Sequence, residues 1–177
     1  RSNEAENQFS RLVIMPFIDA SFTQGRLDGK HRGSCSGLRS IYDSCINFLE
    51  INAKEVLRVT EIEIGNFQLN ENDNFDDNNE KSTNDEILSM SKITSIDLFC
   101  NGIWKPIQEA LTTKLSSIFN PGIAATLHSN YVASMKFLDE LENILGKNLK
   151  NTLRSRLRRH ESYSKFMQKW NLPIYFH

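Results

Sequence analysis

The chain has 177 residues, of which 39% are hydrophobic and 24% charged, and its formal net charge at pH 7 is −1. This length suits one domain, alone or with one polar segment. The near-neutral charge gives no overall field that would favour nucleic acid or an acidic membrane. No apolar stretch reaches the roughly 18 residues of a membrane-spanning helix. Because the first residue is Arg1, we expect a fragment or a processed chain.

The cysteines are Cys35, Cys45 and Cys100, an odd number with no Cys-x-x-Cys pair. This spacing indicates reduced thiols, with Cys45 and Cys100 buried as small hydrophobic residues.

The first predicted helix covers residues 4–22. Its inner face comprises Phe9, Leu12, Val13 and Phe17. Pro16 stands inside this pattern, so we expect a kink or a break there.

Residues 24–37 contain four glycines and several basic residues, which predicts a mobile loop. A phosphate-binding loop is rejected here, because the glycine spacing is one residue short and no strand precedes it.

A second helix is predicted over residues 36–66. Its inner stripe is Leu38, Ile41, Tyr42, Cys45, Phe48, Leu49, Asn52, Val56, Val59 and Ile62 or Glu63. The β-branched run at 59–64 leaves a strand end as the alternative. Residues 68–88 are acidic and asparagine-rich, which predicts a disordered linker. A calcium loop is disfavoured there, because the required Asp spacing and turn glycine are missing.

Residues 93–145 predict a helical hairpin with a tight turn at Asn120-Pro121-Gly122. The first arm places Ile96, Phe99, Ile103, Ile107, Ala110, Leu111, Leu115 and Ile118 on one face, and the second arm does the same with Leu127, Tyr131, Met135, Leu138, Leu141 and Leu145. We expect Ser95 and Thr126 to cap the two helices, Pro106 to bend the first, and Gly146 to end the second.

Two short helices complete the predicted fold, an all-α bundle of about six helices within a single domain over residues 1–177. The first carries Leu149, Leu153 and Leu157, and the second Tyr163, Phe166, Met167 and Trp170. The proline at 173 stops the last helix, and the apolar tail at 174–176 is expected to pack on the bundle. Trp170 is predicted to anchor this end in the core, with an exposed anchor for a partner as the alternative.

The last two helices also carry a basic stripe. It consists of Lys147, Lys150, Arg154, Arg156, Arg158, Arg159, Lys165 and Lys169. A solvated outer face is the simplest interpretation, with contact to an acidic partner or to phospholipid headgroups as alternatives. Nucleic acid is disfavoured, because no recognised nucleic-acid module accompanies the stripe.

The sequence offers no catalytic or metal site. His31, His128, His160 and His177 are scattered, and none has a second ligand at metal-binding spacing. No Gly-x-Ser-x-Gly nucleophile motif occurs. We therefore expect no enzyme and no cofactor.

Three blocks of the chain carry a resemblance to a known family. They are Ser117-Ile-Phe-Asn-Pro-Gly122, the segment His128–Glu142, and Ser164–Phe176, of which Lys169-Trp-Asn-Leu-Pro-Ile-Tyr-Phe176 is the most specific. These blocks resemble subunit 2 of the conserved oligomeric Golgi (COG) complex, a multisubunit vesicle-tethering complex. The match is closest from Ser95 to Phe176.

The resemblance implies a non-enzymatic helical scaffold on the cytoplasmic face of Golgi membranes, acting in intra-Golgi retrograde transport and Golgi organisation. It implies other COG subunits as partners, with SNAREs and small GTPases as further candidates. The alternative function is a peripheral membrane or phosphoinositide-binding module that uses the basic stripe.

Overall fold

The structure, a computed structural model, describes residues 2–29, 35–60 and 96–170. All regular elements in these ranges are helices, which confirms the predicted all-α bundle. The predicted linker over 68–88 and the tail at 171–177 lie outside the described residues.

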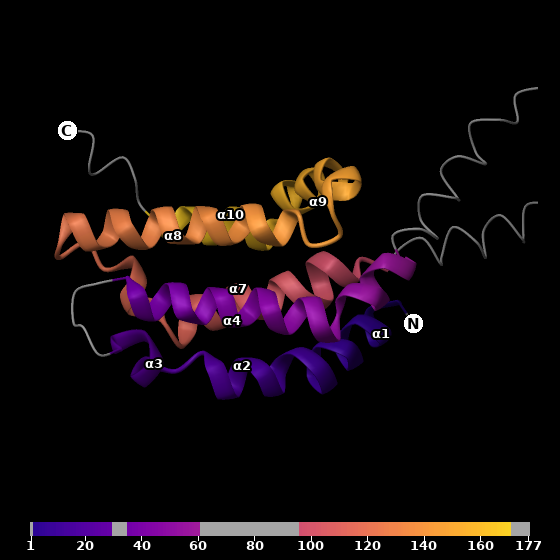
Figure 1. Cartoon of the computed structure of the whole chain (residues 1–177), viewed down its shortest axis with the longest axis horizontal. Helices are drawn as coiled ribbons and strands as arrows, with labels where there is room; N and C mark the ends of the chain where they lie inside the picture. The colour runs from indigo at the N-terminus through magenta and orange to yellow at the C-terminus, as the bar shows by residue number, and fades with distance from the viewer. Residues whose placement is uncertain (1, 30–34, 61–95, 171–177) are drawn as a thin grey trace, which may run out of the picture.

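Most helices run along the long axis of the molecule, and they form layers that lie one above another in Figure 1. One layer contains α1 (Ser2–Phe9), α2 (Met15–Ser21) and α3 (Gln24–Asp28), and the next contains α4 (Ser36–Asn52) and α7 (Lys105–Thr113). The opposite layer contains α8 (Ala124–Glu142), α9 (Lys147–Arg159) and α10 (Glu161–Gln168). Contacts of α4 with α8 and of α7 with α10 join the second layer to the third.

Two π-helical stretches, η1 (Ser10–Ile14) and η2 (Leu98–Trp104), precede the two prolines inside helices. Pro16 and Pro106 each follow as the second residue of the next α-helix. Proline lacks an N–H, and its ring clashes with the carbonyl four residues earlier, so a wider turn before it relieves the conflict. The helix from residue 2 to 21 is therefore widened rather than broken at Pro16.

The π-helical turn also shifts the phase of the first helix. Leu12, predicted on the inner face, is 66% exposed, so this part of the prediction is wrong. Ile14, Ile18 and Phe22 are buried instead, with Phe9, Val13 and Phe17 packed beside them. An extra residue in the turn rotates every later side chain relative to a regular α-helix.

The glycine-rich segment at 24–37 is ordered into a helix in part, contrary to the predicted mobile loop. Thr23 caps α3 by accepting a hydrogen bond from the backbone N–H of Arg26. Gly37, near the start of α4, is buried against α3. A Cβ atom there would lie only 2.0 Å from the carbonyl oxygen of Leu27, so glycine permits this close backbone approach. Residues 30–34 lie outside the described residues.

The second predicted helix is interrupted at Ala53. It ends at Asn52, turns at Ala53 and resumes over 54–60, and the predicted remainder to residue 66 lies outside the described ranges. Leu38, Ile41, Tyr42, Cys45 and Leu49 are buried as predicted. After Ala53 the buried position is Leu57, whereas Val56 and Val59 are 44% and 56% exposed. Asn52 is exposed as well, so the predicted inner positions Asn52, Val56 and Val59 are wrong. For Val56 and Val59, the turn at Ala53 changes the phase of the stripe.

The predicted hairpin is present, with its first arm divided into η2, α7 and the 3₁₀ turn η3 (Ser116–Phe119). Its apolar face is buried from Phe99 to Ile118. Asn120 stabilises the turn by accepting a hydrogen bond from the Gly122 N–H, and buried Asn130 donates to the carbonyl of Ile118. Such bonds satisfy backbone groups that a helix end leaves open.

Two of the three expected caps of this region, Thr126 and Gly146, differ from the prediction. Ser95 is outside the described residues, and Asp97 caps η2 by accepting from the Cys100 N–H. Thr126 lies inside α8, which begins at Ala124 without a side-chain cap. Gly146 does have a positive φ of 93°, but it precedes α9, while α8 ends earlier at Glu142.

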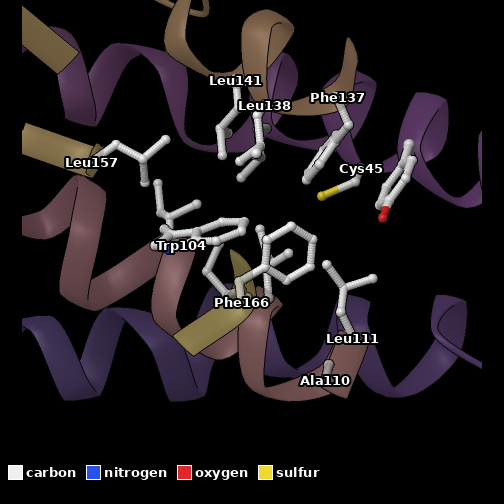
Figure 2. Close-up of a cluster of buried hydrophobic side chains, with 14 of the residues drawn as sticks. Cys45, Trp104, Ala110, Leu111, Phe137, Leu138, Leu141, Leu157 and Phe166 are labelled. Carbon is white, nitrogen blue, oxygen red and sulfur yellow. The ribbon is translucent and has the colours of Figure 1, made fainter. Parts of the chain in front are cut away.

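The core is centred on aromatic residues contributed by η2, α8 and α10. Figure 2 shows Trp104 and Phe166 among leucines from α7, α8 and α9, with Phe137 beside Cys45. Trp170 is 1% exposed and its ring centroid lies 4.6 Å from that of Phe119, so its predicted burial in the core is confirmed.

Cys45 and Cys100 are also buried, as predicted. Burial raises the pKa of the Cys45 thiol, which favours the unreactive protonated form.

Candidate functional site

The basic stripe occupies α9 and α10, at the edge of the third layer (Figure 1). Leu153 and Leu157 turn the apolar side of α9 into the core, which leaves its cationic side chains on the outer side. The sequence places few acids within the stripe itself. The structure brings acids to it from α8 and from the residue before η2.

Glu142, at the end of α8, forms the centre of an ion-pair cluster. Its side chain is fully buried. Arg154 Nε donates to Glu142 Oε2 at 2.7 Å, and Arg158 Nε donates to Oε1 at 3.1 Å. The two arginines lie one helical turn apart on α9, so each oxygen of the carboxylate meets one guanidinium. A buried carboxylate requires such partners, because an unpaired charge in the interior is strongly unfavourable.

Asp139, one turn before Glu142, extends the cluster. Lys150 Nζ lies 2.8 Å from Asp139 Oδ1, and Arg154 Nη2 lies 3.2 Å from the same oxygen. The hydrogen bond from Lys150 lowers the pKa of Asp139 below its usual value, with the charge of Arg154 adding to the effect. We name the five residues Asp139, Glu142, Lys150, Arg154 and Arg158 the α8–α9 clasp.

Arg156 faces a different element, because it pairs with Asp97 at the start of η2. Asp97 belongs to a polar cluster in which its backbone N–H donates to Glu6 Oε1 at 2.6 Å. His160, between α9 and α10, lies 3.0 Å from Asn101 and 2.7 Å from Ser162. These contacts tie α1, η2, α9 and α10 together through buried or half-buried polar groups.

Five of the eight stripe residues are thus engaged within the chain, since Lys165 also pairs with Glu161 at 2.6 Å. Lys147, Arg159 and Lys169 are exposed and form no ion pair in the part of the chain that the structure describes. The sequence alone does not single out Glu142 as a partner of the stripe. The spacing of Asp139 and Glu142, three residues apart just before a short turn into a basic helix, was the available signal.

Neither a metal site nor a membrane span is found in the described ranges. No group of three potential ligands occurs among residues 2–29, 35–60 and 96–170. Over the same residues, no helix has both the length and the hydrophobicity needed to cross a bilayer.

Comparison with known proteins finds similarity to the conserved oligomeric Golgi complex subunit 2 of two animals. The human protein is 27% identical over 176 residues, which is 99% of this chain and 20% of the human protein. The Drosophila melanogaster protein is 23% identical over 174 residues, or 98% of this chain and 20% of the fly protein. The chain therefore spans about a fifth of the length of the curated relatives it matches. No protein-family model matches the chain, and no solved structure does.

Proposed function

We propose that the chain is part of a non-enzymatic subunit of a Golgi vesicle-tethering complex related to the conserved oligomeric Golgi complex. The observation that carries the proposal is the extent of the similarity to subunit 2, which covers 99% of the chain in the human protein. The apolar stripes that build the helical core lie within the similar region. Similarity over a whole helical bundle favours a common architecture more strongly than a short motif would.

The subunit would act through protein–protein contacts, in intra-Golgi retrograde transport and Golgi organisation. Its partners would be other subunits of the complex, with SNAREs and small GTPases as further candidates. We place it at the cytoplasmic face of Golgi membranes, as a peripheral protein. An all-helical scaffold with charged outer faces suits this role, since helical surfaces offer extended contact areas without a catalytic cleft.

The alternative, a membrane or phosphoinositide-binding module, depends on free cations in the basic stripe. Arg154, Arg156 and Arg158 are paired with acids of the same chain, which reduces the charge available to anionic headgroups. The geometry therefore supports protein contact over lipid contact.

Affinity purification of the full-length parent protein from its own cells tests the proposal. We expect the other subunits of the tethering complex to copurify with it in near-stoichiometric amounts. Recovery of the protein alone, with these subunits present in the same lysate, would overturn the proposal. Sedimentation of the chain with anionic vesicles at several salt concentrations tests the alternative, which requires strong and salt-sensitive binding.

A further inference from the structure

A polar groove of about 690 Å³ lies between α7 and α10. One wall comes from η2 and α7 and the other from His160 and α10. Its lining includes five charged residues and one amide, namely Lys105, Glu109, Glu161, Lys165, Lys169 and Gln108. We call this feature the α7–α10 groove. Its volume is within the range of binding sites, but its lining is mainly polar, unlike the apolar lining of most small-molecule pockets.

Only some of the charged side chains in the groove have an ion-pair partner among the described residues. Lys165 pairs with Glu161 at 2.6 Å, and this hydrogen bond lowers the pKa of Glu161 below its usual value. Lys105 and Lys169 are exposed and form no ion pair with any described residue, although the charge of Lys105 also helps to lower the pKa of Glu161. Three ammonium groups thus face two carboxylates, one of which is already engaged, so the groove has an excess of positive charge.

Gln108 adds a neutral hydrogen-bonding group at the base of the same wall. It is only 6% exposed, although it lines the groove. Among the described residues, its amide makes one side-chain hydrogen bond, which is long at 3.4 Å, to Thr112 Oγ1. A buried amide has capacity for up to four hydrogen bonds, so most of the capacity of Gln108 remains open to a ligand.

We propose that the α7–α10 groove binds an acidic segment of a partner protein. Carboxylates of the segment pair with Lys105 and Lys169, and Gln108 hydrogen-bonds the peptide backbone between them. The proposal rests on the proposed function, because it names the surface and the partner chemistry through which such a tethering subunit makes a contact. Charge pairs of this type contribute mainly to specificity and association rate, so binding should be modest and sensitive to salt.

A bilayer fits this surface less well than a peptide does. Peripheral helices meet membranes through a projecting apolar face flanked by cations. Here the cations line a concave surface, and the exposed carboxylate of Glu109 lies among them. A narrow acidic chain can enter the groove and reach Gln108, whereas a bilayer surface contacts only its rim.

An NMR titration of the isotopically labelled 177-residue chain with a short glutamate-rich peptide tests the inference. The side-chain amide of Gln108 gives its own signals and reports directly on the groove. We expect these signals and the backbone amides of α7 and α10 to shift in a saturable, salt-sensitive manner. The same peptide with glutamine in place of every glutamate should cause no such shifts.

Matched double variants locate the site. Lys105→Glu with Lys169→Glu should weaken binding by about tenfold or more, because two attractions become repulsions. Lys147→Glu with Arg159→Glu makes the same change in net charge on α9, outside the groove, and should leave binding near the wild-type level. Equal weakening in both pairs, or peptide-induced shifts confined to α9, would overturn the inference.

A third result would identify a lipid surface instead. If the groove variant loses sedimentation with phosphatidylserine vesicles while the glutamate peptide causes no shifts, the groove serves a membrane and the inference is overturned. Copurification of the parent protein with the tethering complex is measured separately. A groove that does not bind the acidic peptide can therefore be distinguished from a parent protein that does not belong to the complex.

Discussion

The α8–α9 clasp gives the arginines of the basic stripe a structural role that can be measured. Arg154→Ala with Arg158→Ala would leave the fully buried Glu142 without these partners. We predict a loss of about 3–5 kcal/mol in the free energy of unfolding, which is typical of leaving one member of a buried ion pair without its partner. Urea denaturation followed by circular dichroism measures the change.

Two comparison variants sharpen this prediction. Glu142→Gln should be milder, about 1–3 kcal/mol, because Arg154 and Arg158 are 40% and 49% exposed and water can solvate them. Lys147→Ala with Arg159→Ala should stay within about 0.5 kcal/mol of the wild type. If the arginine double variant changes the free energy of unfolding as little as this control does, the ion pairs of Glu142 with Arg154 and Arg158 do not stabilise the fold.

Trp170 is the second residue whose role can be decided by stability. Its side chain is 1% exposed and its ring lies near those of Phe119, Tyr131 and Phe166. We predict that Trp170→Ala costs about 3–5 kcal/mol, as for other buried aromatic residues. At about 2–4 °C per kcal/mol for a chain of this size, the melting temperature should fall by roughly 6–20 °C.

Lys169→Ala, at the exposed neighbouring position, is the control for Trp170→Ala and should melt with the wild type. Trp170→Phe should fall between them, since it keeps an aromatic ring and removes a buried indole N–H that has no hydrogen-bond partner among the described residues. A Trp170→Ala protein that melts within about a degree of wild type would favour the interface role instead.

At the scale of the elements, the contact between α3 and α4 depends on Gly37. A Cβ atom at this position would lie 2.0 Å from the Leu27 carbonyl oxygen and 2.6 Å from that of Arg26. We predict that Gly37→Ala forces α3 away from α4 and lowers the free energy of unfolding by at least about 1–3 kcal/mol. Thermal denaturation is a sufficient measurement.

Gly25 is the matched position for Gly37, because it lies in the same predicted loop and a Cβ there would meet nothing within 4 Å. Gly25→Ala should stabilise the chain by about 0.5–1 kcal/mol, since alanine is favoured over glycine inside a helix. Equal effects of the two substitutions would show that the close approach at Gly37 has no energetic consequence.

The elements that sequence analysis predicted well are those whose apolar period is regular. The face from Phe99 to Ile118 follows helical spacing and is buried as expected, as are Leu153 and Leu157 of α9. The errors fall where geometry departs from a regular helix. The π-helical turn before Pro16 exposes Leu12, and the turn at Ala53 exposes Val56. A prediction from periodicity assumes a constant number of residues per helical turn. It therefore cannot identify the buried positions that come after a π-helical turn or a break in the helix.

The sequence predicts which cations make up the candidate site but not which residues they contact. The eight cations were found, yet their partners Asp97 and Glu142 lie on other elements, 59 residues from Arg156 and 12 from Arg154. The α7–α10 groove had no sequence signal, because it exists only where two helices meet. Gly37 belongs to the predicted mobile loop, because the sequence does not reveal its tight contact with Leu27, which is likewise a product of tertiary packing.

At the scale of the whole molecule, a connected core should make unfolding cooperative. Buried residues from all three layers, from Ile14 in η1 to Trp170 after α10, belong to one hydrophobic cluster. We predict a single thermal transition, with a calorimetric enthalpy equal to the van't Hoff enthalpy. Differential scanning calorimetry measures both. Two resolved transitions, or a calorimetric enthalpy well above the van't Hoff value, would contradict the prediction that residues 1–177 form a single domain.

The two indole nitrogens of this core have an optical consequence. In the described part of the chain, Trp104 and Trp170 are buried with their N–H groups unpaired, and both rings lie against Phe166 of α10. An indole away from water emits at shorter wavelength than a hydrated one. The native chain should therefore emit at a shorter wavelength than the unfolded chain, and its emission should shift to longer wavelength when α10 leaves the bundle. Because α10 also forms a wall of the groove, tryptophan emission would reveal without any label whether a bound partner keeps this helix docked or pulls it away.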